Sequence, residues 1–499
     1  MPVDPRTPVL IGYGQINHHE GGAFEENTVE PVDLMAAAAR QAAAPRVLEA
    51  VDAIRVVNLL SARYRDPGLL LGQRIGADRP VTRYSGVGGN VPQSLVNQAC
   101  LDIRHGRSGV VLLAGAEMWR TRMQLRSRGS RLTWTQQDES VPMAHGSDEH
   151  VPMAGAAEQR IGLDRPAHVY PLFEQALRIS MGESIEDHRK RIGELWARFN
   201  AVAVHNTHAW IREPIAPEEI WQDGPTNRMV CWPYTKLMNS NNMVDQSAAV
   251  ILTSVETATR LHVPGERWVY PYAGTDAHDT YAISERAELH RSPAIRIAGA
   301  RALALAGLGI DDLDYVDLYS CFPSAVQIAA AELGLPVDDP GRPLTVTGGL
   351  TFAGGPWSNY VMHSIATMAE LLIASPGHRG LITANGGYLT KHSFGVYGTG
   401  PPTSEFRWED VQSVVNQEPT RGAAVDWEGV GIIESWTVPF SRDGQPERAF
   451  LAVRTRDESR TLASIPDPAV ASALIHDDFC TIEAGAQVAV RADGTATLQ

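Results

Sequence analysis

Residues 347–356 read TGGLTFAGGP, a glycine-rich stretch in the middle of a predicted α/β unit. Before it, residues 294–306 have the pattern of a helix and residues 315–319 that of a short apolar strand. After it come a predicted helix at about 360–374 and the apolar strand 380–383. Helices that alternate with nearly continuous apolar strands are typical of parallel strands covered on both faces.

A second unit of the same order lies earlier in the chain. A helix at 32–44 and a strand at 53–59 precede the turn SGVGGN at 85–90, and a helix at about 93–105 and the strand 109–116 follow it. This self-similarity predicts a pseudo-symmetric core of two halves, with a chance match of generic α/β patterns as the alternative. The offsets are 262, 260 and 271 residues, from Asp52 to Asp314, from Gly88 to Gly348 and from Gly109 to Gly380.

Length and charge narrow the class of protein. The 499 residues are enough for two to four domains, and 43% hydrophobic residues exclude disorder of the whole chain. There are 43 basic and 58 acidic residues, so the net charge is −15. Nucleic-acid binding needs clustered Lys and Arg, so the composition argues against it but leaves room for a local patch that binds one phosphorylated ligand.

The four cysteines lie far apart in the sequence. No C-x-x-C spacing occurs among them, so neither a disulfide framework nor a structural zinc site is expected, and a reducing cytosol fits best. The N-terminus lacks the pattern of a signal peptide, and no apolar run approaches about 18 residues. The sequence therefore predicts a cytoplasmic protein without a metal site or a membrane span. The cysteines are Cys100, Cys231, Cys321 and Cys480.

A long insertion, residues 119–228, separates the two predicted units. Insertions of this length on a compact core usually form lids or binding loops. Its start carries the densest basic run of the chain. A solvated charged loop is one interpretation, and a phosphate cradle for a ligand such as coenzyme A is the other. The run consists of Arg120, Arg122, Arg126, Arg128 and Arg131.

The sequence pattern changes from alternating helices and strands to short β-rich segments after about residue 401. Short β-rich segments such as 430–439 and 449–454 are separated by Asp-Gly turns, which signal hairpins. About 90 residues of this kind predict a small barrel or sandwich, and OB-type barrels have this size and spacing. Few basic and aromatic residues occur together here, which weakens the nucleic-acid role that such barrels often have.

Four stretches of the core resemble the thiolase superfamily over roughly residues 8–398. GVVLLAGAE at 109–117 and the segment 233–253 are similar to parts of the family's first half. DLYSCF at 317–322 resembles the HDCF motif of sterol-carrier-protein-type thiolases, and TGGLTFAGGP resembles the glycine loop that normally ends Gly-His-Pro. The extension after residue 400 is similar to the additional C-terminal domain of thiolase-like proteins of type 1.

This resemblance implies a layered α/β fold. The expected architecture has two pseudo-symmetric βαβαβαββ halves stacked as α-β-α-β-α, a loop-domain insertion and a C-terminal OB-type β-barrel domain. Thiolases commonly dimerise through the core, but the additional domain leaves both a homodimer and a monomer open. The expected boundaries are 1–118 and 229–270 for the first half, 119–228 for the insertion, 271–400 for the second half and 401–499 for the additional domain.

The resemblance also permits a test of the catalytic set. The family uses a cysteine nucleophile, a histidine base and a second cysteine as acid/base, because a lowered thiol pKa and a nearby base make the thiolate. In this sequence the matching positions carry Asn90, Gly355 and Asn385, with Ala384 in place of Asn385 if the register slips. Cys100 lies within a predicted helix and is expected to be buried. Conventional thiolase activity is therefore predicted to be absent.

Other side chains are candidates for the site. Tyr319 takes the place of the histidine in the HDCF-like motif and has the chemistry to donate a hydrogen bond to a thioester oxygen or to transfer a proton. Cys321 is a nearby thiol, and His392 is the best histidine candidate, ahead of His363. A structural role is the alternative for each of them. The candidate ligand-binding residues are Arg120, Arg122, Arg126 and Asn242.

The resemblance leaves three functional hypotheses. The first is an acetyl-CoA acetyltransferase-like protein of lipid metabolism that binds CoA thioesters but lacks the Cys-His-Cys set. The second is a tyrosine-based retro-aldolase, or another enzyme that acts on a carbon–carbon bond of an acyl-CoA. The third is a CoA-thioester binding protein with no chemistry. All three expect CoA or acyl-CoA as a ligand, no permanently bound cofactor, and no nucleic-acid or membrane partner.

Overall fold

The first half of the core is built on a mixed five-stranded sheet. A computed structural model describes residues 3–19, 29–146, 151, 153–476 and 485–499. In this sheet the strand order is β3-β2-β4-β7-β1, and β7 runs antiparallel to both of its neighbours. The bounds are β1 (Pro8–Asn17), β2 (Ala53–Val56), β3 (Val81–Tyr84), β4 (Val110–Met118) and β7 (Asp245–Ser254).

The second half repeats most of this topology in a second sheet. Its order is β9-β10-β11-β8-β12, and its fourth strand in sequence, β11, is again antiparallel to both neighbours within the repeat. No assigned strand lies outside β9 among the described residues, whereas β3 lies outside the corresponding β2. The bounds are β8 (Tyr270–His278), β9 (Tyr315–Asp317), β10 (Arg379–Gly386), β11 (Lys391–Gly398) and β12 (Arg407–Asp410).

Strand pairing confirms the predicted repeat. Ala53 lies opposite Val111 in the first sheet, and Tyr315 lies opposite Gly380 in the second. The two halves therefore correspond at offsets of 262 and 269 residues. The first value equals the predicted one. The second is two residues shorter than the predicted 271, because Gly109 precedes β4 whereas Gly380 already lies inside β10.

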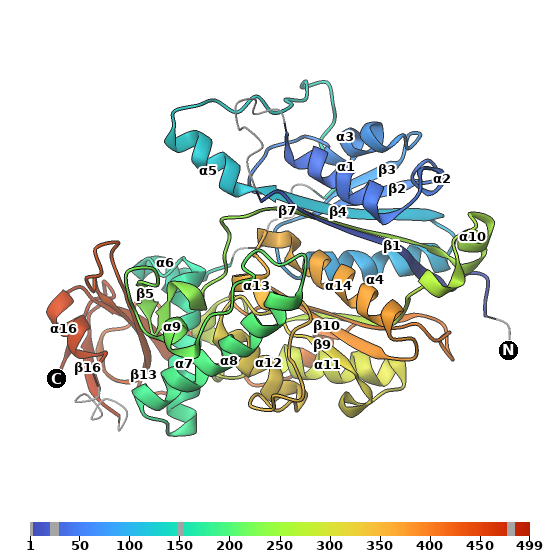
Figure 1. Cartoon of the computed structure of the whole chain (residues 1–499). Coiled ribbons are helices and arrows are strands. Elements are labelled where there is room, and N and C mark those ends of the chain that lie inside the picture. The colour runs from blue at the N-terminus through green and yellow to red at the C-terminus, as the bar shows by residue number, and fades with distance from the viewer. Residues whose placement is uncertain (1–2, 20–28, 147–150, 152, 477–484) are drawn as a thin grey trace.

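The core has five layers (Figure 1). Helices α4 (Val91–Arg104) and α14 (Tyr360–Ala374) lie between the two sheets. Every residue of β4 is buried, as its unbroken apolar run predicts for a strand covered on both faces. The outer layers contain α1 (Pro31–Ala42), α2 (Pro45–Leu48) and α3 (Pro67–Ile75) on one side, and α11 (Pro293–Ala306) and α12 (Pro323–Leu333) on the other; η4 (Ile283–Glu285) contacts α6 and β15 instead.

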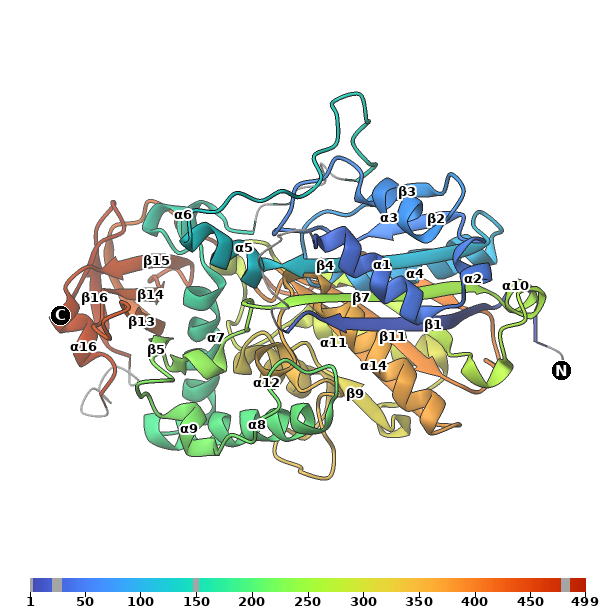
Figure 2. The same cartoon turned by 45° about the horizontal axis from the view of Figure 1, so that its top comes forward.

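The insertion between the halves is largely helical rather than a loop. Two long helices, α7 (Pro166–Met181) and α8 (Ile185–His205), pack against the second half of the core (Figure 2). Short elements fill the rest of the insertion and the remaining connections. They are α5 (Trp119–Ser127), α6 (Ala156–Ile161), α9 (Pro217–Trp221), β5 (Met229–Trp232), β6 (Tyr234–Thr235), η2 (Lys236–Met238), α10 (Val255–Arg260), η3 (Gly265–Arg267), η5 (Ile310–Asp312), α13 (Gly349–Phe352) and η6 (Trp357–Asn359).

The C-terminal addition is an antiparallel sheet at one end of the molecule (Figure 2). Its order is β15-β14-β13-β16-β17, and β5 of the insertion pairs with β13. The predicted OB-type barrel is not confirmed, because the described end strands β15 and β17 share only the isolated bridge Ser464–Thr495. The elements are α15 (Gln412–Val415), β13 (Gly429–Pro439), β14 (Ala449–Arg454), β15 (Arg460–Ile465), α16 (Pro468–Ala473), β16 (Gln487–Val490) and β17 (Ala496–Leu498).

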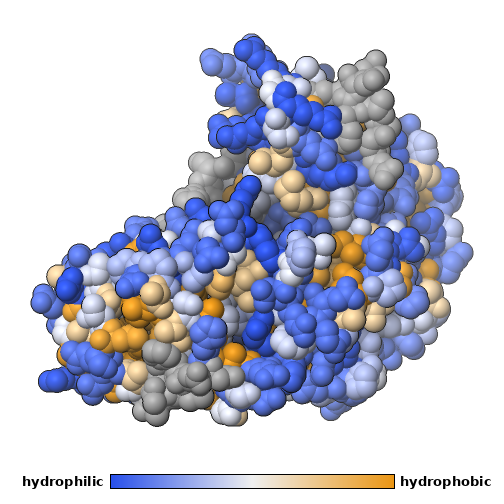
Figure 3. Space-filling view, turned by 60° about the vertical axis from the view of Figure 1, so that its left-hand side comes forward, coloured by the Kyte–Doolittle hydropathy of each residue, from blue (hydrophilic) through white to orange (hydrophobic). Residues whose placement is uncertain are grey.

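The surface agrees with the composition. Hydrophilic residues cover most of the face in Figure 3, and apolar residues show there only in small groups. In the part of the chain that the structure describes, no helix combines the length and the apolar character that crossing a membrane requires. The apolar residues are instead gathered into large buried clusters around the two sheets and inside the C-terminal addition.

Candidate functional site

The start of α4 meets the ends of β9 and β10 deep in the core. Only a glycine fits at position 89, because a Cβ atom there would overlap the Tyr319 hydroxyl and the carbonyl oxygen of Asn385. The side chain of Asn90 is equally confined, since a Cβ atom at Gly386 would lie 2.5 Å from its Oδ1. The tertiary structure thus brings together Asn90, Tyr319 and Asn385, three positions that sequence reasoning singled out.

The two asparagines leave hydrogen-bonding capacity unused. Asn385 Nδ2 donates to Tyr170 Oη at 3.0 Å. The Oδ1 atoms of both Asn90 and Asn385 are buried and have no partner among the described residues. Buried polar atoms are normally satisfied, so each of these unpaired acceptors suits a ligand or a water molecule that donates a hydrogen bond.

Tyr319 places a neutral hydroxyl against Gly89 at the start of α4. Its backbone N–H donates to Thr383 Oγ1 at 2.9 Å, and its ring meets Tyr360 edge-on at 5.6 Å between centroids. Burial, followed by the proximity of Cys321 and Tyr360, raises the pKa of Tyr319 well above its usual value. The hydroxyl makes no hydrogen bond within the described residues, so a protonated donor is available to an incoming oxygen.

Cys321 lies beside this cluster but is a poor nucleophile. Its Sγ is 3.9 Å from Asn385 Nδ2, and 7% of the residue is exposed. Burial raises the pKa of the Cys321 thiol to about 12, although hydrogen bonds from Tyr170 and neighbouring groups oppose the shift. Because the thiolate is the reactive form, about one thiol in ten thousand would be ionised at pH 8.

Cys321 should therefore resist alkylation in the folded protein. We expect iodoacetamide at pH 8 to leave the peptide that contains Cys321 unmodified under native conditions, and to modify it fully after unfolding in guanidinium chloride. Peptide mapping by mass spectrometry measures both states, and free glutathione in the same tube verifies the reagent. Labelling of Cys321 in the native protein at a rate near that of glutathione would contradict a neutral buried thiol.

The other cysteines do not supply a nucleophile from within the described residues. Cys100 is fully buried in α4, as predicted, and Cys231 is buried against Thr437. Burial raises the pKa of Cys231 to about 12, and it raises that of Cys100 as well. Cys480 lies outside the described residues.

His392 reaches the cluster from the neighbouring strand. The β10–β11 hairpin, which turns at Gly387 with φ +71°, places His392 directly opposite Asn385. His392 Nε2 is 3.3 Å from Asp279 Oδ2, an ion-pair distance without the alignment of a hydrogen bond. Together with Tyr319 and Asn385, His392 lines a small void of about 10 Å³, which is close to the space that one water molecule needs.

Asp279 completes this arrangement behind His392. Burial opposes ionisation of Asp279, but the close contact with His392 and the nearby charge of Arg286 together lower the pKa of its carboxyl. Ser292 Oγ donates to Asp279 Oδ2 at 2.5 Å, and the N–H of Ala294 donates to Oδ1 at 3.1 Å. The carboxylate is thus held in position and orients the imidazole of His392.

Gly355 lies in a loop that borders the site but offers no side chain. Its N–H donates to the carbonyl oxygen of Asn241 at 2.9 Å, and Asn242 Nδ2 donates to its carbonyl oxygen at 2.8 Å. Asn242, a predicted ligand residue, therefore supports this loop. Ser358 Oγ accepts from the N–H of Gly88 at 3.1 Å, which joins the loop to the start of α4.

His363 lies apart from this cluster. It lies in α14, and its Nδ1 is 2.9 Å from Gln15 Oε1 of β1, on the side of the first sheet. Burial, assisted by the nearby His208, lowers the pKa of His363 to about 3. His363 is therefore a neutral imidazole that contacts a core glutamine, which is typical of a structural role. The sequence had placed it behind His392 among the histidine candidates.

The three arginines predicted to bind a phosphate do not converge on this cluster. Arg120 Nη1 donates to the carbonyl oxygen of His19 at 2.7 Å. Arg122 Nη1 donates to that of Ser61 at 2.7 Å, and Arg126 is exposed near the end of α5. Their role as phosphate ligands stays a prediction.

Sequence reasoning missed two contributors. Tyr170 of α7 is fully enclosed; its Oη accepts from the N–H of Leu389 at 2.8 Å as well as from Asn385, and its ring stacks on Phe322 at 4.4 Å. Lys391 Nζ donates to the carbonyl oxygen of Val87 at 2.7 Å, and burial lowers its pKa. No sequence motif marks Tyr170. Lys391 directly precedes the predicted His392 and lies close to a glycine turn, and this position was the signal that could have identified it.

One open cavity touches the cluster. It has a volume of about 410 Å³ and lies over the start of α4. None of the described residues that line it is acidic, although the chain carries a net charge of −15. Its polar and basic lining includes Arg83, Asn90, His145 and Lys391. Elsewhere in the described part of the chain, no three His, Cys, Asp or Glu side chains gather as a metal site would require.

Comparisons with known proteins identify relatives of the same fold. The family model described as thiolase-like protein type 1 additional C-terminal domain matches residues 410–495, and the model described as thiolase C-terminal domain-like matches residues 275–357. A crystal structure described as a monomeric SCP2-thiolase-like protein type 1 from Mycobacterium smegmatis is 31% identical, with 100% of both chains covered and a TM-score of 0.81.

Two more distant structures share the fold. Human mitochondrial 3-ketoacyl-CoA thiolase is 15% identical, with 80% of this chain and 100% of that chain covered and a TM-score of 0.57. A structure described as the Ltp2-ChsH2(DUF35) aldolase is 19% identical, with 80% and 99% covered and a TM-score of 0.58. At this level of identity they support the architecture alone.

Proposed function

Because the chain belongs to the SCP2-thiolase-like protein type 1 family, we propose that it binds an acyl-CoA thioester without catalysing thiolase acyl transfer. The observation that carries the proposal is the cluster at the start of α4. There a neutral tyrosine hydroxyl and two unpaired amide oxygens gather where a thiolase would need a thiolate. This arrangement suits the recognition of a polar acyl group better than covalent chemistry on it.

The absence of acyl transfer follows from the side chains present. Gly89 has no room for any side chain, and Asn90 is not a nucleophile. Cys321 is the thiol nearest to the cluster among the described residues, and its pKa of about 12 keeps it protonated. Gly355 supplies no base. A covalent acyl-enzyme therefore has no acceptor with which to form.

The chemistry of a CoA thioester complements the free hydrogen-bonding groups. A thioester carbonyl oxygen is an acceptor, and the Tyr319 hydroxyl is a donor with no other partner in the described structure. The pantetheine arm carries two amide N–H donors, and the Oδ1 atoms of Asn90 and Asn385 are unpaired acceptors. Pairing these groups would remove the cost of leaving buried polar atoms unsatisfied.

The 410 Å³ cavity supports a route for the ligand. It is lined by Asn90 at the cluster and by the cationic side chains of Arg83 and Lys391. Cations without acidic neighbours among the described lining residues are complementary to the phosphates of coenzyme A. In this proposal the acyl end lies against Tyr319 and the phosphates lie toward Arg83.

A second candidate function is acid–base chemistry on a carbon–carbon bond of the acyl group. The observation that favours it is the pair His392–Asp279 beside the free hydroxyl of Tyr319. Tyr319 would polarise the carbonyl oxygen as a hydrogen-bond donor, because its raised pKa opposes a role as a base. His392, oriented by Asp279, would then exchange a proton through the single-water void.

The test is calorimetric titration with acetyl-CoA. We expect Tyr319→Phe to weaken binding about 5- to 30-fold, since one hydrogen bond of about 1–2 kcal/mol is lost. Tyr281→Phe, which removes a hydroxyl from the surface near His278, should bind like the wild type. No binding by the wild type, or equal binding by Tyr319→Phe, would contradict the proposal.

Turnover assays separate the two candidates. Thiolysis of acetoacetyl-CoA by the wild type would refute the absence of thiolase chemistry. Cleavage of a 3-hydroxyacyl-CoA that is lost in both Tyr319→Phe and His392→Gln would establish the second function instead of simple binding.

A further inference from the structure

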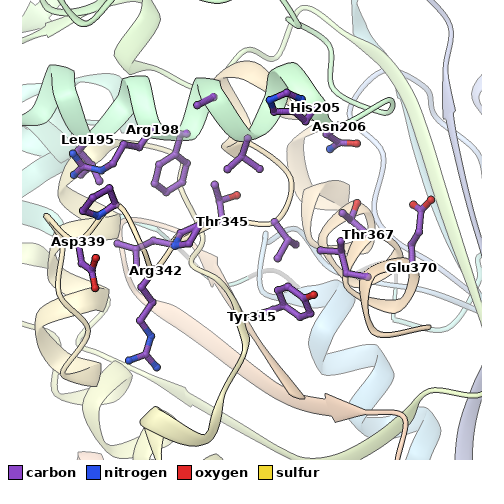
Figure 4. A pocket seen from close by; sticks show the side chains of 18 of the residues that line it. Leu195, Arg198, His205, Asn206, Tyr315, Asp339, Arg342, Thr345, Thr367 and Glu370 are labelled. Carbon is purple, nitrogen blue, oxygen red and sulfur yellow. The ribbon is translucent and has the colours of Figure 1, made fainter. Parts of the chain in front are cut away.

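A second, larger cavity shares no described lining residue with the candidate site. It has a volume of about 840 Å³, is partly open to solvent and lies between α8, the segment 337–346 and α14 (Figure 4). None of the described residues that line it belongs to the cluster at the start of α4. Its function is therefore a separate question from the binding of a thioester.

The cavity exists because the pseudo-symmetry of the core is broken here. In the first half, β2 is flanked by the edge strand β3 through regular parallel pairing. In the second half, β9 has no such strand outside it in the described chain. The segment 337–346 lies there instead, and the carbonyl oxygen of its Leu344 accepts a hydrogen bond from the N–H of Leu318 at 2.9 Å. The insertion places α8 beside this gap, so that the gap becomes a partly open pocket instead of a flat surface.

The walls facing the cavity are predominantly apolar. Helix α8 contributes Phe199 and Val202, the segment opposite contributes Pro343 and Val346, and α14 contributes Leu371. Figure 4 shows these three elements surrounding a common space. A volume of 840 Å³ bounded in this way lies within the range of about 300–1,000 Å³ that is typical of small-molecule sites.

The two cations in the lining are already engaged. Arg198 donates to the carbonyl oxygen of Val337 at 2.9 Å. Arg342 forms an ion pair with Asp311 at 3.1 Å, and in Figure 4 its side chain extends away from the centre of the cavity. Neither guanidinium is therefore placed to neutralise an anionic ligand.

The polar groups of the lining are also largely satisfied. Thr345 Oγ1 donates to Asp317 at 2.9 Å, and Thr367 Oγ1 accepts from Gln15 at 3.1 Å. Glu370 is exposed at the far rim and would repel an anion. A ligand would thus gain mainly from the burial of hydrocarbon rather than from hydrogen bonds or charge.

We propose that this cavity is a second ligand site, which binds an uncharged, hydrocarbon-rich small molecule. The proposal does not depend on the binding of acyl-CoA, because the two sites share no lining residue among those described for the 410 Å³ and 840 Å³ cavities. It commits to a neutral ligand because every charged group that faces the cavity is either paired or acidic.

Nile red, an uncharged fluorescent apolar probe, tests the proposal on the full chain. We expect saturable binding by the wild type and at least a tenfold weaker affinity for Val202→Trp, which fills the cavity from α8. The matched control is Glu194→Trp on the exposed side of the same helix, which should bind like the wild type. If Val202→Trp fails to fold, Leu371→Glu places a charge in the opposite wall and should have the same effect.

Competition identifies the ligand class. Dodecanol should displace the probe, whereas dodecanoate and acetyl-CoA should not. Absence of saturable binding, or equal binding by the filled and control variants, would overturn the site. Stronger displacement by dodecanoate would overturn the neutral class, and displacement by acetyl-CoA would show that the probe occupies the thioester site. Dimerisation that excludes the probe would identify a second copy of the chain as the occupant.

Discussion

Replacement of His188 with leucine should lower the free energy of unfolding by about 3–5 kcal/mol, because it leaves a fully buried carboxylate without its ion-pair partner. His188 of α8 lies with Nε2 2.6 Å from Glu174 Oε1 of α7, and Glu174 is completely buried. Tyr234 and Gln327 also donate to Glu174, each at 2.6 Å. Two neutral donors would remain in the variant, but they do not balance a buried negative charge. Urea unfolding followed by circular dichroism measures the loss.

A double variant separates charge from packing. Glu174→Gln in the His188→Leu background removes the isolated charge and should recover a large part of the lost stability, as a double-mutant cycle would report. Lys190→Ala breaks a solvent-exposed pair on the same helix and should have no measurable effect. A double variant as unstable as the single one would show that the cost lies in packing alone.

The same network predicts an acid sensitivity with a defined sign. Burial opposes ionisation of Glu174, but the contacts with His188, Tyr234 and Gln327 lower its pKa in the folded protein. Its stabilising contribution is therefore complete above the ordinary glutamate pKa of about 4.3 and disappears as the pH falls through the folded value. The double variant, which lacks both groups, should show a weaker loss of stability in this range.

Replacement of Gly348 with alanine should cost about 2–5 kcal/mol of unfolding free energy. Gly348 has φ +99°, a conformation that costs a residue with a Cβ atom about 1–2 kcal/mol. A Cβ atom there would also lie 2.7 Å from Ala203 Cα and 2.8 Å from Ala203 N in α8, and overpacking adds about 1–3 kcal/mol. The glycine loop is thus a point of close approach between α8 of the insertion and the core.

Gly307→Ala is the matched control. Gly307 ends α11 with φ +71°, but a Cβ atom there would meet nothing within 4 Å. The free energy of unfolding of this variant should therefore fall only by the cost of the left-handed backbone conformation, about 1–2 kcal/mol. Thermal unfolding of both variants gives the comparison. Equal losses would show that backbone conformation alone, and not contact with α8, makes glycine necessary at position 348.

The motif positions were found from the sequence because they lie at the ends of strands and at the start of a helix. Asn90, Tyr319 and Asn385 each follow or precede an apolar run, and the parallel topology directs such ends to a common edge. Tyr170 could not be found in this way. It lies 215 residues before Asn385, inside an amphipathic helix whose pattern reports burial but not the partner of a hydroxyl.

The C-terminal addition shows a second feature that the sequence pattern did not predict. Its hairpin turns and short strands were correctly predicted, but the closed barrel was not confirmed. Closure depends on how the first and last strands of a sheet meet, and nothing in the alternation of residues along one strand encodes that meeting. Pairing of β13 with β5 of the insertion is a further contact across about 200 residues that local patterns do not reveal.

The sequence by itself determined the repeated α/β units and the residue types at positions 90, 355 and 385, where the resemblance predicts the thiolase catalytic residues, because periodicity and residue identity at a motif position are local properties. Only the tertiary structure decided that Tyr319, His392 and Tyr170 gather around Asn385, and that α8 covers an apolar pocket beside β9. The physical reason is that hydrogen-bond partners, burial and cavity walls come from segments far apart in the chain. Their meeting is set by the packing of whole helices and sheets.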